Sequence, residues 1–170
     1  MDIYLIGKYL HIVLAIAWLG GAFGMVLLGT LAARSNDSAR LGHVIGMIET
    51  LAPRVFIPST VLILVIGLYL TWANWAFSEA WIVFGLVGIF ITGFIGARIL
   101  TPMTEEANAM DPGPEKDALM RKMLRSARGD MIMLAVIVWA MVSKPQWSDV
   151  TEVAAMAAII VASLVIFVRR

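Results

Sequence analysis

A single histidine lies inside the first apolar stretch of the chain, which runs from Tyr4 to Leu31. This residue, His11, is followed seven positions later by Trp18 and then by a group of glycines that includes Gly21. An ionisable side chain is costly to bury in a membrane segment, so it is a functional candidate by default. The chemistry open to a neutral imidazole is hydrogen bonding, proton relay and ligation of a metal ion or haem iron.

The helical spacing of this segment places His11 on a face where small and large residues alternate. With 100° between successive residues, the same face contains Gly7, Leu14, Ala15, Trp18, Ala22, Met25 and Gly29. Small residues are typical of faces on which membrane helices pack closely against one another. We therefore expect the imidazole to point into the protein, about 10 Å below the outer membrane surface at about 1.5 Å per residue.

Three roles for His11 stay open. The imidazole hydrogen-bonds to a neighbouring helix, it is an axial ligand of haem b, or it relays protons or binds a metal ion. In the haem interpretation, Trp18 and Gly21 belong to the same cofactor site, because the glycines open a flat slot beside the histidine. The sixth iron ligand would then be Met141 or Met156, or no protein group.

The other histidine, His43, is excluded as a second ligand to the same iron. It precedes Pro53, the expected cytoplasmic end of the second span, by ten residues, or about 15 Å in a helix. His11 lies near the opposite face of a hydrocarbon core that is about 30 Å thick. One chain cannot bring both imidazoles onto one iron in this topology.

The composition is that of an integral membrane protein. Of the 170 residues, 61% are hydrophobic and 15% are charged, and the mean hydropathy is +0.88; soluble domains average about 45–50% apolar and about 25% charged residues. The net charge of +1 gives no indication of nucleic-acid binding. Because the chain has no cysteine, disulfides, thiolate-bound metals and iron–sulfur clusters are excluded.

Five apolar segments are candidates to span the bilayer. They are Tyr4 to Leu31, Pro53 to Trp72, Trp81 to Leu100, Met131 to Ser143 and Val153 to Val168. The fourth is short for a span, so we extend it back through Ala127 to Asp130 at the interface. We predict an all-α transmembrane bundle of about five helices, which forms one integral membrane domain over residues 1–170.

The distribution of basic residues predicts the orientation. Eleven of the 13 Lys and Arg residues fall in the first and third connections, on their flanks or in the final pair Arg169 and Arg170, which leaves Lys8 and Lys144. By the positive-inside rule, the N-terminus is outside and the C-terminus is in the cytoplasm, as in a multi-pass protein of the cell inner membrane. Four tryptophans then lie near the outer interface: Trp72, Trp75, Trp81 and Trp147.

Both cytoplasmic connections are predicted to contain helices. The Asn-Asp-Ser sequence at 36–38 provides N-cap residues for an amphipathic helix over 40–51, which extends the second span and is broken or kinked at Pro53 and Pro58. Residues 114–128 form a charged helix with an apolar stripe. This stripe suits an interfacial helix on the cytoplasmic leaflet, which we favour, or the docking of a partner.

Two groups of residues bear on helix packing. Gly85, Gly88, Thr92 and Gly96 share a narrow face of the third span, which favours a tight helix pair over a flat cofactor. Asp130 and Arg54 are expected at cytoplasmic helix ends, where they can pair with one another or with Arg128 and Glu49. We interpret both as structural interfacial ions, because headgroup water is within their reach.

The run from Leu10 to Gly21, LHIVLAIAWLGG, resembles the first helix of a loose superfamily. This superfamily contains copper-resistance-D-like membrane proteins, HemJ-type protoporphyrinogen oxidases and the membrane domain of cytochrome-c-linked urate oxidases, with a helix-one His followed by Trp and Gly. The stretches Trp75 to Trp81 and Asp130 to Pro145 look more like one branch, an uncharacterised family of predicted small integral membrane proteins.

The resemblance implies an antiparallel helical bundle and, in the HemJ branch, haem on the helix-one histidine, which here is His11. The chain has no second histidine in a predicted span, so porphyrinogen oxidation does not carry over and enzymatic activity stays open. The leading hypothesis is a b-type haem-binding or redox-accessory protein. The alternative is a cofactor-free structural or accessory subunit that works in the lipid bilayer as a homo-oligomer or in a larger membrane complex.

Overall fold

The computed structural model describes residues 2–35 and 37–168, and the side chains of its last helix up to residue 164. Asn36, Arg169 and Arg170, on which the cap and charge predictions partly depend, lie outside the described residues. The described chain is helical throughout apart from its connections. Its elements are α1 (Ile3–Arg34), α2 (Ser38–Leu51), η1 (Ala52–Phe56), α3 (Ile57–Asn74), α4 (Ala80–Ile95), η2 (Gly96–Leu100), α5 (Thr101–Ala109), α6 (Pro114–Ser143) and α7 (Val150–Val168).

Several of these elements join end to end into long helices. The elements α2, η1 and α3 form one helix of 37 residues, and α4, η2 and α5 form one of 30 residues. With α1 and α6, these give four helices that are long and apolar enough to cross a membrane, and α7 is a shorter apolar helix over Val150–Leu164. The arrangement fits the predicted multi-pass helical bundle.

The two π-helical segments are explained by nearby prolines. A proline ring clashes with the carbonyl group four residues earlier and cannot donate the helical hydrogen bond. Arg54, four residues before Pro58, lies in η1, and Arg98, four residues before Pro102, lies in η2. The wider turn relieves the clash without ending the helix, so the predicted break near Pro53 and Pro58 is a π-helical segment within a continuous helix.

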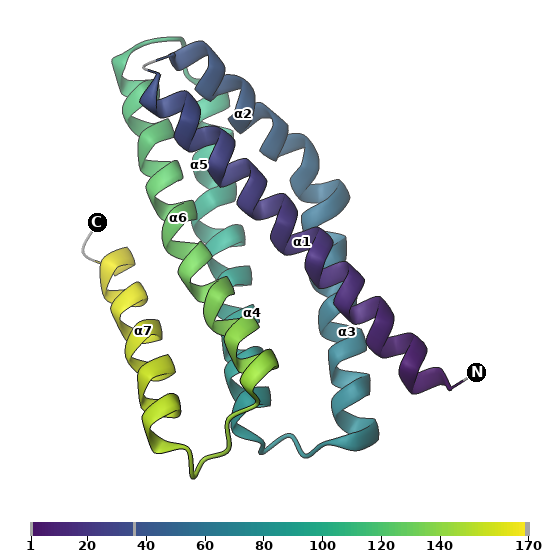
Figure 1. Cartoon of the computed structure of the whole chain (residues 1–170). Coiled ribbons are helices and arrows are strands. Elements are labelled where there is room, and N and C mark those ends of the chain that lie inside the picture. Colours follow the sequence, from purple (N-terminus) through teal and green to yellow (C-terminus); the bar gives the residue numbers. More distant parts are fainter. Residues whose placement is uncertain (1, 36, 169–170) are drawn as a thin grey trace.

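The predicted N-cap of the helix before the second span is confirmed. Asp37 accepts a hydrogen bond from the backbone N–H of Arg40 at 2.9 Å, as an N-cap aspartate does. From this cap, α2 runs back along the last turns of α1 (Figure 1). Leu41, Val44 and Ile45 of α2 are buried.

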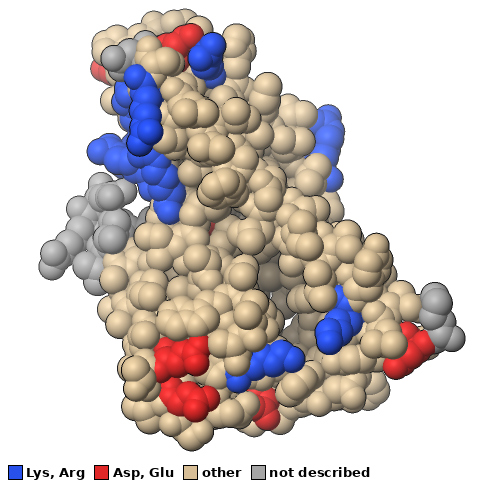
Figure 2. Space-filling view, viewed as in Figure 1, with Lys and Arg blue, Asp and Glu red and all other residues tan. Residues whose placement is uncertain are grey.

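Figure 1 shows two groups of helices that meet along part of their length. The first is the pair of α1 and α3, and the second contains α4, α6 and α7. A central cluster joins them halfway, with Trp18 of α1, Ile63 of α3, Ile89 of α4 and Leu134 of α6. Toward the loops that follow α3 and α6, the two groups diverge. Charged side chains gather near both ends of the molecule, while the middle of the visible face carries few of them (Figure 2).

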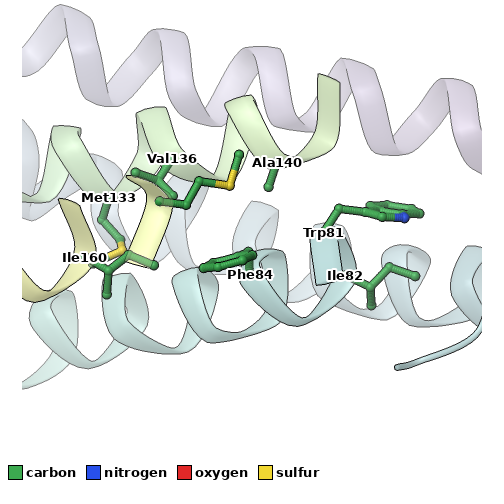
Figure 3. Close-up of a cluster of buried hydrophobic side chains, with 8 residues drawn as sticks. Trp81, Ile82, Phe84, Met133, Val136, Ala140 and Ile160 are labelled. Atoms are coloured by element: carbon green, nitrogen blue, oxygen red, sulfur yellow. The ribbon is translucent and has the colours of Figure 1, made fainter. Parts of the chain in front are cut away.

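A second cluster holds α4, α6 and α7 together (Figure 3). Its buried members are Trp81, Ile82, Phe84, Met133, Val136, Ala140, Met156 and Ile160. The third span also uses its glycines as predicted: a Cβ atom at Gly85 would collide with the methyl group of Met141, and one at Gly88 would collide with Ile137. The tight helix pair predicted for this face is therefore the pair of α4 and α6.

The expectation of an interfacial helix over 114–128 is wrong. These residues form the first half of α6 and continue into the span without a break. Their apolar stripe packs inside the protein, where Met120 and Met123 form a buried cluster with Leu41 and Ile45 of α2. The sequence pattern does not distinguish the two cases, because an interfacial helix and a helix packed against other helices each bury one apolar face.

Candidate functional site

His11 lies in the contact between α1 and α3. A Cβ atom placed on Gly67 of α3 would be 3.0 Å from Cε1 of the imidazole and 3.6 Å from its Nδ1. The inward face predicted for α1 is thus confirmed. No sequence pattern singles out Gly67, whose lack of a side chain makes room for the imidazole.

One ring nitrogen of His11 has no hydrogen-bond partner. Nδ1 is buried, and no donor or acceptor among the described residues reaches it. Since buried polar atoms in proteins are usually paired, this nitrogen is the least satisfied polar group of the α1–α3 contact.

Trp18 and Gly21 are packed against other side chains. Trp18 is 9% exposed and lies in the central cluster against Ile63 and Leu134. A Cβ atom on Gly21 would be 3.1 Å from Cε1 of Phe56, so the ring of Phe56 occupies the flat slot expected beside this glycine.

Met141 and Met156 face the other group of helices. Met141 packs on Gly85 of α4, and Met156 is fully buried in the cluster of α4, α6 and α7. The imidazole of His11 packs on α3 instead. The structure therefore brings His11 and Trp18 onto one packing face but places both methionines in a different contact.

His43 is exposed on α2. It is far from His11, as the predicted topology requires. Its neighbour Val44 contacts the position of Gly29. Gly29 follows His11 by 18 residues in α1, which is about 27 Å along a helix. The two imidazoles cannot share one iron within a chain.

The residues around His11 do not form a haem pocket in this arrangement. The ring lies against α3, and Phe56 occupies the space beside Gly21. A porphyrin on His11 would require α1 and α3 to separate near Gly67. The described residues also contain no group of three or more His, Cys, Asp or Glu side chains that could hold a metal ion.

Asp130 is a buried polar residue, and the expectation that water reaches its carboxylate is wrong. It is 7% exposed, and its Oδ1 accepts a hydrogen bond from Oγ1 of Thr92 at 3.0 Å, across the contact of α6 with α4. Headgroup water does not reach it, and it does not pair with Arg54, which donates to the carbonyl of Thr50. The spacing to Met133, Leu134 and Ile137 along α6, which are three, four and seven residues later, was the signal that it shares their inward face.

The alternative partners predicted for Asp130 and Arg54 are also engaged elsewhere. Arg128 donates to the hydroxyl group of Thr30 at 3.1 Å, and Glu49 accepts from the amide of Asn108. The alternative pairs with Arg128 and Glu49 are therefore wrong as well.

The loops after α3 and α6 meet at the end of the molecule opposite α2 and α5. The ammonium group of Lys144 lies over two indole rings, 4.4 Å from the centroid of Trp75 and 5.1 Å from that of Trp81. The indole N–H of Trp147 donates to the carbonyl of Ser78 at 2.7 Å. The sequence predicts these tryptophans as interface anchors and gives no indication that Lys144 joins them.

No curated protein and no solved structure matches this chain. The resemblance to copper-resistance-D-like and HemJ-like proteins is not confirmed by these comparisons, whereas the expectation of an uncharacterised membrane family is. The family model described as "Predicted integral membrane protein (DUF2269)" matches residues 5–145, which is most of the chain, and the protein belongs to this family.

Proposed function

We propose that the protein is a cofactor-free structural or accessory subunit of a membrane complex, in which His11 is a helix-packing residue. The observation that carries this proposal is the contact of the imidazole with Gly67, where a Cβ atom would lie only 3.0 Å from Cε1 of the ring. A ligand of haem iron needs open space beside one ring nitrogen. Here, α3 at Gly67 lies against the Cε1 edge of the ring, between its two nitrogens.

The second intramembrane ionisable residue has a similar place. Asp130 joins α6 to α4 through Thr92, just as His11 lies between α1 and α3. Polar side chains at helix contacts contribute to association inside membranes, where the hydrophobic effect between helices is absent. Each of the two helix groups thus contains one such residue, which is an arrangement suited to holding helices together.

Four glycines within the predicted membrane spans are left open by the chain's own packing. A Cβ atom on Gly20 or Gly24 of α1, on Gly93 of α4 or on Gly96 of η2 would meet nothing within 4 Å. Gly67, Gly85 and Gly88, in contrast, are each covered by a side chain of a neighbouring helix. Because small residues allow another helix to approach closely, the open glycines support association with a second copy or with a partner subunit.

The proposed setting is the cell inner membrane, with the N-terminus outside and the C-terminus in the cytoplasm. The support is the distribution of charge: basic side chains gather over the end of the molecule where α1 ends and α6 begins (Figure 2). By the positive-inside rule, this end belongs in the cytoplasm.

Haem binding at His11 is the second candidate, and one observation favours it. The buried Nδ1 atom has no partner among the described residues, and an unprotonated ring nitrogen is what an axial ligand offers. The two candidates differ in one measurable property, because a bound haem absorbs strongly in the visible range.

The test is the absorption spectrum of the full chain, purified in detergent from haem-replete cells, oxidised and then reduced. The proposal expects no Soret band in the wild type. A Soret band that is retained in His43→Ala and lost in His11→Ala would overturn it in favour of haem.

Association is tested by native mass spectrometry of the protein extracted with its surrounding membrane. We expect an assembly larger than the monomer, which Gly20→Leu and Gly93→Leu weaken. Gly46→Leu is the matched control, because Gly46 of α2 has equally open surroundings. A wild type that is only monomeric would contradict the role of a subunit.

A further inference from the structure

An open groove lies between the last turn of α1 and the first half of α6, with a volume of about 490 Å³. Four of its lining residues are arginines: Arg34, Arg121, Arg125 and Arg128. We propose that this groove binds a phosphate group, and that the phosphate belongs to the headgroup of an anionic phospholipid. The inference is independent of the proposed function, because it holds with or without a partner subunit.

The helical spacing of α6 builds the basic wall of the groove. Arg121, Arg125 and Arg128 follow one another by four and three residues and therefore share a face of the helix. Arg34 is in the last turn of α1. Guanidinium groups present several N–H donors in one plane and match the oxygen atoms of a phosphate.

Two of the arginines are held in place by α1. Arg121 donates from Nη1 to the carbonyl of Ala33 at 3.1 Å, and Arg128 donates from Nε to the hydroxyl of Thr30 at 3.1 Å. The guanidinium group of Arg128 has further N–H donors beyond the Nε used here. Side chains fixed in this way lose less conformational entropy when a ligand binds.

Three arginines of the groove, Arg34, Arg125 and Arg128, have no carboxylate partner among the described residues. None of the residues that line the groove is Asp or Glu. The ion pair of Arg40 with Asp37 lies outside the groove. An anion would therefore lower the electrostatic energy of the cluster.

The position of the groove favours a lipid over free phosphate. From Tyr9 to Ala33, α1 has no Lys, Arg, Asp or Glu, a length of about 37 Å at about 1.5 Å per residue. Arg34 comes directly after this run, at the depth where a bilayer places its phosphates. Leu31 and Leu27, three and seven residues before Arg34, are 52% and 46% exposed and offer an apolar surface for acyl chains below the arginines.

Basic groups at this depth are known to recognise anionic headgroups, with about 1 kcal/mol per Lys or Arg near the surface. This corresponds to about a fivefold change in affinity for each arginine removed. Figure 2 shows the basic side chains gathered over this end of the molecule.

The test uses the full chain in detergent and short-chain phosphatidylglycerol as the probe, with the thermal unfolding midpoint as the readout. Short-chain phosphatidylcholine and inorganic phosphate at the same concentration are the comparison ligands. We expect a rise in the midpoint with phosphatidylglycerol alone. An equal rise with phosphatidylcholine would overturn the recognition of charge, and an equal rise with inorganic phosphate would overturn the assignment to a lipid.

The variants are Arg125→Gln, whose side chain makes no hydrogen bond within the described residues, and Arg98→Gln, an exposed arginine of η2 outside the groove. Arg125→Gln should weaken phosphatidylglycerol binding about fivefold, and Arg98→Gln should leave it unchanged. If both variants bind as the wild type does, or both bind equally less, the groove is not the site. Size-exclusion profiles check that both variants are folded before the titration.

Discussion

The ammonium nitrogen of Lys144 lies 4.4 Å from the ring centroid of Trp75 and so joins the C-terminal end of α6 to the C-terminal end of α3. Trp75 also contacts Trp81 edge to face, with centroids 5.0 Å apart. The two helix groups, which diverge toward this end of the molecule (Figure 1), are therefore connected here by one lysine between two indole rings. This contact joins the stretches Trp75 to Trp81 and Asp130 to Pro145, which resemble one family of predicted membrane proteins.

Replacing Lys144 by Met should lower the free energy of unfolding. The cation–π contacts with Trp75 and Trp81 contribute about 0.5–1 kcal/mol each at partly exposed sites. Lys144 has a backbone φ of 49°, and Met at the same position bears the same backbone cost, so the comparison isolates the charge. We expect a loss of about 1 kcal/mol in Lys144→Met, measured by denaturant unfolding in detergent, and no loss in Lys122→Met on the exposed side of α6. Equal losses in both variants would contradict the contact.

The contact of His11 with Gly67 predicts a compensating pair of substitutions. Gly67→Ala places a Cβ atom 3.0 Å from the imidazole, and overpacking of this kind costs about 1–3 kcal/mol. In His11→Ala the space is free, so the double variant should be more stable than the sum of the two single changes predicts. A thermal unfolding series of the four proteins gives the coupling.

Gly46→Ala, in α2, is the control for this series. Its Cβ atom would meet nothing within 4 Å, so it reports only the higher helix propensity of alanine, which is about 1 kcal/mol in isolated helices. If the effects of His11→Ala and Gly67→Ala simply add, the two residues are not in contact and the structural role of His11 is lost.

Helix periodicity predicted which side of α1 faces inward, because 100° per residue places Gly7, His11 and Trp18 on one face whatever lies opposite. It does not say which helix lies opposite. The partner of His11 is fixed by the tertiary arrangement of α1 and α3, and Gly67 carries no chemistry that would single it out in a sequence. For the same reason Met141 had the right depth for an iron ligand but faces α4.

Asp130 is predicted at the membrane surface because only the strictly apolar residues, which begin at Met131, are counted as the core of the fourth span. The helix begins at Pro114, and the residues before Met131 pack against α1 and α2 instead of lying on the leaflet. A span supported by neighbouring helices tolerates polar residues on its inward face, which a count of apolar residues does not detect.

The absence of cysteine makes the orientation directly measurable. Single cysteines are introduced at Ala76, in the loop after α3, and at Asp111, in the loop before α6; both residues are exposed. We expect a membrane-impermeant maleimide to label Ala76→Cys in intact cells and to label Asp111→Cys only after permeabilisation. The reverse pattern would show that the N-terminus is inside, and labelling of both in intact cells would contradict the helical spans between them.

The buried pair of Thr92 and Asp130 predicts that the hydrogen bond, and not the charge, holds α4 against α6. Asp130→Asn keeps an oxygen that can accept from the hydroxyl of Thr92, so it should stay close to the wild type in stability. Asp130→Leu and Thr92→Val each remove one partner and leave the other without its bond. We expect each to cost about 0.5–2 kcal/mol, the range of interhelical hydrogen bonds in membranes, measured as unfolding in a detergent mixture.

The comparison of Asp130→Asn with Asp130→Leu shows whether Asp130 acts through its hydrogen bond to Thr92 or through its negative charge. If Asp130→Asn is as unstable as Asp130→Leu, the carboxylate itself is needed and the hydrogen-bond account fails. If Asp130→Asn folds as the wild type does but the protein loses its assembly in the native mass spectra, the carboxylate has a role beyond packing. Thr92→Ser is the conservative control, because it keeps the hydroxyl donor that Thr92 offers to Oδ1 and should preserve both stability and assembly.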